Sequence, residues 1–138
     1  MREREKERDR LRHSLELAKK VQQILLPKRY PSMSGLVVAG KSIYCDETGG
    51  GYHNFIELKD NAAEKLGVAV GDVAGHGISS ALLMSTVRSP LRQHLTLPES
   101  ISRVTADVNR QPAGDFADSG QFITLFYLTV DPTRQVLE

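Results

Sequence analysis

The spacing of apolar residues changes along the chain, and each spacing predicts a different element. Intervals of three and four predict an amphipathic helix that ends at Pro27, with its apolar stripe at Leu11, Leu15, Ala18, Val21 and Leu25. The charged residues 2–10 continue it as a solvated helix end, because like charges at i,i+4 offset the opposite charges at i,i+3. Too few heptads are present to decide between a linker helix, a dimer seam and a helix packed on its own domain.

After Pro27 the pattern becomes one of strands. It predicts strands over 36–44, 52–58, 66–72 and 122–130, and a last strand that begins at Val136. The second and third of these form a hairpin across the turn at 59–61. Residues 122–130 are apolar at both parities, which favours a central strand covered on both faces.

Two further helices are expected between residues 78 and 110. Pro90 is expected to kink the first or to end it near Arg88, because a proline inside a helix costs about 3 kcal/mol. Thr96 and Glu99 fit a capping box that begins the second. The second helix would bury Ile101, Val104 and Val108, and residues 111–120 read as a polar loop.

Composition narrows the class of protein. The 138 residues suffice for one domain with a core, and 18 basic against 17 acidic residues argue against a nucleic-acid-binding protein. Cys45 is the only cysteine, so no internal disulfide can form. Without a membrane-length apolar run or a signal peptide, a cytoplasmic protein with no membrane partner is expected. A strand that begins in the last residues suggests a fragment.

The segment 66–77 carries the clearest chemistry. Leu66, Val68 and Val70 share one face of a strand, and Asp72 continues that parity at the rim of the same core. A carboxylate beside a glycine-rich turn suits Mg²⁺ or Mn²⁺, although an acid in such a place can also be only a turn or cap residue. A dinucleotide fingerprint is disfavoured, because its third glycine is Ser80 and Asp72 would repel a pyrophosphate.

Several segments together resemble one family, the bacterial branch of the PPM metal-dependent serine/threonine phosphatases, which includes the sporulation stage II and sigma-B regulator phosphatases. The resemblance runs from about Leu15 to the end and is carried by 21–27, 48–50, 71–77, 81–84 and 122–127. It implies an α+β fold of two packed antiparallel sheets flanked by helices, a PP2C-like sandwich, here incomplete at the C-terminus. Residues 1–27 would be a linker or dimerisation helix, and 28–138 a partial phosphatase domain.

The resemblance also implies an activity. Family members hydrolyse phosphoserine or phosphothreonine on a partner protein, often an anti-sigma-factor antagonist, with two Mn²⁺ or Mg²⁺ ions that activate water. Asp72 and the main-chain carbonyl of Val73 match the family's metal contacts. Gly51 and Asn54 stand where the family pattern has aspartates. Two divalent ions need several carboxylates, so a weak or inactive metal site is expected.

The remaining site residues have plainer interpretations. His76 is a candidate general acid toward the leaving oxygen, or a loop histidine without a role. Gly49, Gly50, Gly75 and Gly77 would serve close backbone approach or positive φ. Three hypotheses remain: a phosphatase, a regulatory pseudophosphatase that binds its partner without catalysis, and a fragment that self-associates through its N-terminal helix.

Overall fold

The computed structural model describes residues 2–44, 49–60, 63–75, 77–97 and 99–138. The N-terminal helix α1 spans Arg2–Leu25. The antiparallel hairpin of β1 (Gly51–Asp60) and β2 (Ala63–Val73) follows, then α2 (Ile78–Leu95) and α3 (Ile101–Phe116). A 3₁₀ turn at Ala117–Ser119 leads into β3 (Ile123–Asp131) and β4 (Val136–Leu137). The four strands form one antiparallel sheet in the order β1-β2-β3-β4.

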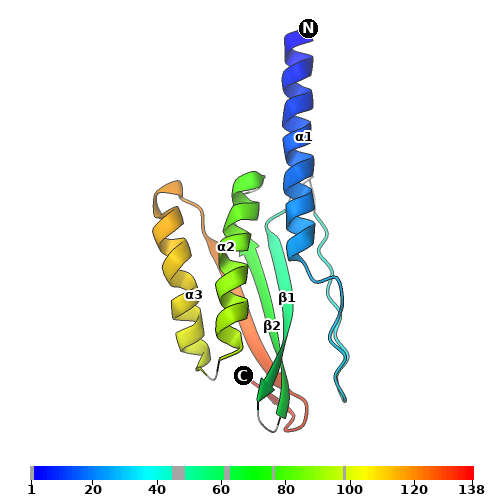
Figure 1. The fold of residues 1–138 in the computed structure, drawn as a ribbon, viewed down its shortest axis with the longest axis vertical. Coiled ribbons are helices and arrows are strands. Elements are labelled where there is room, and N and C mark those ends of the chain that lie inside the picture. The colour runs from blue at the N-terminus through cyan, green and yellow to red at the C-terminus, as the bar shows by residue number, and fades with distance from the viewer. Residues whose placement is uncertain (1, 45–48, 61–62, 76, 98) are drawn as a thin grey trace.

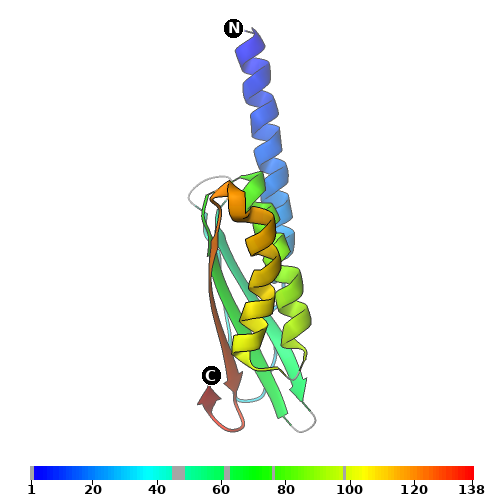
Figure 2. The ribbon, with the colours of Figure 1, turned by 90° about the vertical axis from the view of Figure 1, so that its left-hand side faces the viewer.

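Helices α2 and α3 lie against one face of this sheet, and α1 runs beside α2 and projects beyond the rest of the chain (Figures 1 and 2). This arrangement confirms the α+β class and the N-terminal helix. The described residues supply one antiparallel sheet and one helical layer of the expected sandwich. None of the described helices has a run of apolar residues long enough to cross a membrane.

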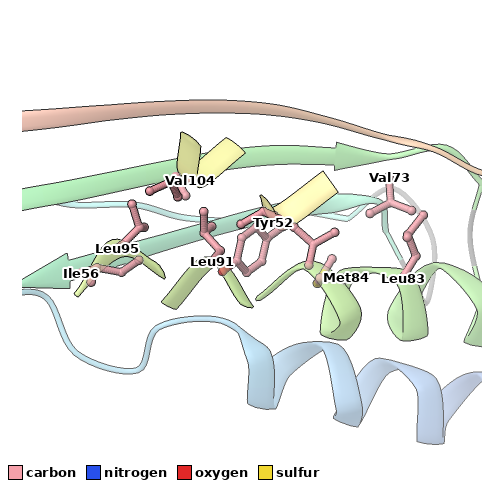
Figure 3. Close-up of a cluster of buried hydrophobic side chains, with 11 residues drawn as sticks. Tyr52, Ile56, Val73, Leu83, Met84, Leu91, Leu95 and Val104 are labelled. Carbon is pink, nitrogen blue, oxygen red and sulfur yellow. The ribbon is translucent and has the colours of Figure 1, made fainter. Parts of the chain in front are cut away.

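The core lies between the helices and the sheet (Figure 3). In β1 and β2, Tyr52, Ile56, Ala69 and Val73 alternate with residues of the opposite face and point toward α2. The helices cover them with the buried side chains Leu83, Met84, Val87, Leu91, Leu95, Val104 and Val108. Burial of each large apolar side chain contributes about 1.5–3 kcal/mol, so this layer supplies the main stabilising term.

The opposite face of the sheet is largely open. Phe126 of β3 is 61% exposed and Val70 of β2 is 49% exposed, so the expectation that 122–130 is covered on both faces is wrong for the described residues. Leu66, Val68 and Val70 do share one face, but it is the face away from the helices. Asp72 follows them onto that exposed face and not onto the rim of the helix-covered core.

The expected strand at 36–44 is absent from the structure. Its only ladder contact is an isolated bridge between Met33 and Leu36, and residues 37–44 have no regular structure. Instead the segment lies over the open face of β1: Tyr30 donates a hydrogen bond to the Gly40 carbonyl, and the Tyr30 ring meets Phe55 edge-on. Val37 is 97% exposed. The alternating apolar residues of 36–44 therefore lack the packing against a core that would stabilise them as a strand.

Three helix boundaries also differ from the sequence expectation. Helix α2 does not end near Arg88 but continues through Pro90, because burial of Val87, Leu91 and Leu95 outweighs the proline's cost of about 3 kcal/mol. The alternative expectation, a kink at Pro90, stays a prediction. The N-cap of α3 is Ser100, whose hydroxyl accepts from the Arg103 amide at 3.4 Å, and Thr96 caps the end of α2 instead. Residues 111–116 extend α3 where a loop was expected, because Pro112 continues its buried stripe by one turn.

Two leucines of α2 are expected to contribute differently to the free energy of unfolding. Leu91 is fully buried, whereas Leu82 on the same helix is 55% exposed. We expect Leu91→Ala to lower the free energy of unfolding by about 2–5 kcal/mol, because it leaves a cavity in the core. Leu82→Ala should change it by less than about 0.5 kcal/mol. Urea unfolding followed by circular dichroism measures both, and equal losses would contradict the assigned layer.

Candidate metal and phosphatase site

Four of the predicted site residues, Gly50, Gly51, Asp72 and Val73, meet where β1 begins and β2 ends. Gly51 pairs with Asp72 in the ladder, and the Val73 amide donates to the Gly50 carbonyl at 2.8 Å. The hairpin therefore places Gly50 and Gly51 directly beside Asp72, although 20 residues lie between Gly51 and Asp72 in the sequence. Thr124 of β3 pairs with Asp72 on its other side and donates to its carbonyl at 3.4 Å.

Gly50 is required by close approach. A Cβ atom at this position would lie 2.3 Å from the Val73 carbonyl oxygen and 2.9 Å from Asp72 Oδ1. The Val73 carbonyl oxygen and Asp72 Oδ1 therefore both lie against the Gly50 backbone, and a side chain at position 50 would collide with them. One carboxylate and one carbonyl oxygen in this position are a donor set for a hard cation.

Gly51 differs from its neighbour, because a Cβ atom there would meet nothing within 4 Å. Its backbone has an ordinary φ, so a side chain at this position meets neither a steric nor a conformational obstacle. The space opposite Asp72 is thus free for a carboxylate at position 51. As written, the chain supplies no charge at that position.

Asn54 is not brought to this cluster. Its position has the opposite parity to Gly51, and the side chain lies under α2 with 2% exposure. There its Nδ2 donates to the Tyr52 hydroxyl at 3.0 Å, and its Oδ1 accepts from Arg92 at 3.3 Å. Burial raises the pKa of Tyr52, and the hydrogen bond from Asn54 and the nearby Arg88 and Arg92 charges partly oppose that shift. Asn54 thus belongs to a buried polar network.

The turn between β2 and α2 has the backbone that its glycines favour. Gly75 and Gly77 have φ of 93° and 86°, a region that other residues rarely adopt. Gly77 is the N-cap of α2, and its carbonyl accepts a hydrogen bond from the Ser80 hydroxyl at 3.0 Å. His76, the candidate general acid, lies outside the described residues.

A pocket of about 610 Å³ opens next to the glycines on the helix-free face. Gly49, Gly50 and Gly51 line one end of it, and the 39–44 segment forms a wall. His53 stands inside, where its Nδ1 lies 3.0 Å from the Ser42 hydroxyl, and partial burial lowers the pKa of its imidazole. The pocket gives a ligand access to the glycine end of β1.

Gln22 of α1 binds the loop formed by Gly49, Gly50 and Gly51, here called the glycine loop. The sequence pattern alone assigned it no role. Its side chain is fully buried; Nε2 donates to the Gly49 carbonyl at 2.6 Å, and the Gly49 amide donates to Oε1 at 3.2 Å. Nearby, Arg88 of α2 donates to the Leu25 carbonyl at 3.1 Å. The sequence offered one signal for this role: Gln22 is a polar residue four positions after Ala18, on the buried side of an amphipathic helix.

The donor set fits one hard cation better than two. Within the part of the chain that the structure describes, no group of three or more His, Cys, Asp or Glu side chains forms around Asp72. Oxygen donors suit Mg²⁺ or Mn²⁺, but one carboxylate offsets little of the charge of a pair of ions. The described residues alone therefore do not make a dinuclear centre.

The chain is similar in sequence and in fold to known proteins. The chain is 32% identical over 120 residues to the phosphoserine phosphatase RsbU of Bacillus subtilis (strain 168), an alignment that covers 85% of this chain. It spans only 33% of the length of RsbU. The crystal structure of the RsbU and RsbW domains of Rv1364c from Mycobacterium tuberculosis is similar with a TM-score of 0.51 and 26% identity, over 62% of this chain and 22% of that one.

The family profile described as Stage II sporulation protein E (SpoIIE) matches residues 62–138, which is more than half of the chain. The matched region runs from β2 to the last residue and so contains Asp72, both core helices and β3. With the likeness to RsbU, this match shows that the chain belongs to the SpoIIE family of PPM-type phosphatases.

Proposed function

We propose that this chain acts on a phosphorylated regulatory protein of the anti-sigma-factor antagonist kind, in the cytoplasm, and that its hydrolysis of phosphoserine or phosphothreonine is weak or absent as written. The observation that carries the proposal is the open position at Gly51, beside an otherwise assembled Gly50, Asp72 and Val73 backbone. Similarity to the phosphoserine phosphatase RsbU supports the substrate class.

Charge explains why activity would be weak. The family is metal-dependent, generally with Mn or Mg, and such ions supply an activated water when bound. In this chain Asp72 and the Val73 carbonyl would hold a cation, and Gly50 keeps the approach to them free. With a single carboxylate among the residues that the structure describes at this site, the second ion would be held mainly by water and would bind weakly.

A pseudophosphatase that binds its partner without catalysis is the second candidate. The observation that favours it is that the fold accommodates Gly51 and Asn54 without strain or an unpaired amide. The β1–β2 register runs without interruption through Gly51, and Asn54 satisfies its amide within the Tyr52 and Arg92 network. A partner surface can thus be retained without the metal charges.

Restoring the carboxylate tests the proposal. We expect Gly51→Asp to bind Mn²⁺ at least about tenfold more tightly than the unmodified chain, because a second charge faces Asp72. Calorimetric titration with Mn²⁺ measures the affinity, and release of phosphate from a phosphoserine-bearing partner peptide measures turnover. Activity only in Gly51→Asp would identify the natural chain as a pseudophosphatase.

The matched control is Gly114→Asp on α3, since a Cβ at this glycine also meets nothing within 4 Å. It adds the same charge at an exposed position of α3 and should leave Mn²⁺ affinity unchanged. Turnover by the unmodified chain at a rate equal to that of Gly51→Asp would refute the proposal of a weakened site.

Gln22 offers a test of how α1 supports the site. We expect Gln22→Ala to lower the free energy of unfolding by about 1–3 kcal/mol, because both backbone groups of Gly49 lose their partner. In a Gly51→Asp background it should also weaken Mn²⁺ binding, because the loop is less well positioned. Gln23→Ala, exposed on the same helix, is the control. Unchanged Mn²⁺ affinity in Gln22→Ala would show that Gln22 is only a packing residue.

Self-association through α1 is a further part of the proposal. Ala18 and Gln22 face the domain, whereas Leu17, Val21 and Ile24 form an exposed stripe at intervals of four and three. We expect the chain to be a dimer, and Leu17→Glu with Ile24→Glu to make it monomeric, since charges cannot be buried in a helix seam. Light scattering at tens of micromolar protein measures the mass, and a monomeric unmodified chain would contradict the interface.

A further inference from the structure

A second group of metal-ligating side chains lies at the opposite end of the helical layer from Asp72. His94 is in the last turn of α2, Glu99 is in the connection, and Asp107 is in α3. Helix α2 has 18 residues, so its length separates this group from the glycine loop by roughly 25 Å. The two groups cannot share an ion.

The three side chains converge on one point. His94 Nδ1 lies 3.5 Å from Glu99 Oε2 and 4.0 Å from Asp107 Oδ2, and one ligand atom of each residue lies within 4.8 Å of the others. Two ligands of a tetrahedral zinc ion, with bonds of about 2.0–2.2 Å, stand roughly 3.3–3.6 Å apart. From a separation of at most 4.8 Å, a relative movement of at most about 1.5 Å would bring each pair of atoms to that spacing.

The His94 ring nitrogen that faces the two carboxylates is itself buried, although the side chain as a whole is 26% exposed. Nδ1 is buried and has no hydrogen-bond partner, although it faces two carboxylates. A buried polar atom without a partner is costly, and a bound cation would satisfy it. The backbone fixes this geometry, because the Leu97 amide donates to the His94 carbonyl at 3.0 Å and closes the turn after α2.

Two arginines also contact Asp107, one at each carboxylate oxygen. Arg110 Nη2 lies 2.7 Å from Asp107 Oδ1, which is the oxygen turned away from His94. Arg103 Nε stands 3.8 Å from Oδ2. Both arginine side chains are more than 70% exposed, so water screens their charge and little free energy holds them in place.

We propose that His94, Glu99 and Asp107 bind a zinc-class divalent ion that ties the end of α2 to α3. One imidazole with two carboxylates suits zinc better than magnesium, because magnesium prefers oxygen ligands alone. Three protein ligands leave a fourth position for water. The ion would stabilise the helical layer and is independent of the phosphatase proposal.

The test uses the full chain with Asp72→Asn, which removes the carboxylate of the other cation site, and ZnCl₂ as the probe. Long-range proton–nitrogen spectra of the imidazoles should show the Nδ1 resonance of His94 moving to that of a metal-bound nitrogen. Calorimetry should show that His94→Gln weakens zinc binding at least about tenfold, since loss of even an outer partner costs that much. Zinc should raise the melting temperature of the unmodified chain but not of His94→Gln.

His13→Gln on the exposed part of α1 is the matched control and should leave zinc affinity unchanged. Glu99→Gln, which keeps the size of the side chain, should weaken binding too, and far-UV circular dichroism verifies that each variant is folded. No zinc binding by the folded chain would overturn the proposal. So would binding that persists in both His94→Gln and Glu99→Gln.

Discussion

Burial of one face of the sheet beneath α2 and α3 is the constraint on which the remaining structure depends. Because side chains alternate across a strand, committing Tyr52, Ala69 and Val73 to the helices sends Gly51, Val70 and Asp72 to the other face. A shift of register by one residue would bury the acid and expose the core. The same packing that stabilises the fold therefore fixes the side on which metal chemistry can occur.

Much of this architecture could be read from the sequence. The hairpin of β1 and β2 has a strong alternating pattern around a turn, and the N-terminal helix has a regular apolar stripe that ends before Pro27. The meeting of Gly51 with Asp72 then follows from antiparallel pairing alone. Local pattern and pairing geometry agree at these positions, which is why prediction succeeded there.

The parts that failed depend on contacts distant in sequence. Residues 36–44 alternate like a strand, yet no neighbouring strand pairs with them, and Gly40 instead lies beside His53 and Phe55. Pro90 has a poor helical propensity that core packing outweighs. Asn54 lies beneath α2, a place that a motif alone does not reveal, and its interpretation as a degenerate metal position stays a prediction. Each error is a case of tertiary contact deciding between local alternatives.

The contact between Gln22 and Gly49 has a consequence for how α1 could influence the rest of the domain. One side-chain amide gives and receives a hydrogen bond with a single residue, as two paired residues do in an antiparallel ladder. Both bonds share one rigid amide plane, so a rotation of α1 about its axis would break them together and not in sequence. The helix and the loop at Gly49 are thus joined by two hydrogen bonds that depend on the orientation of one side chain.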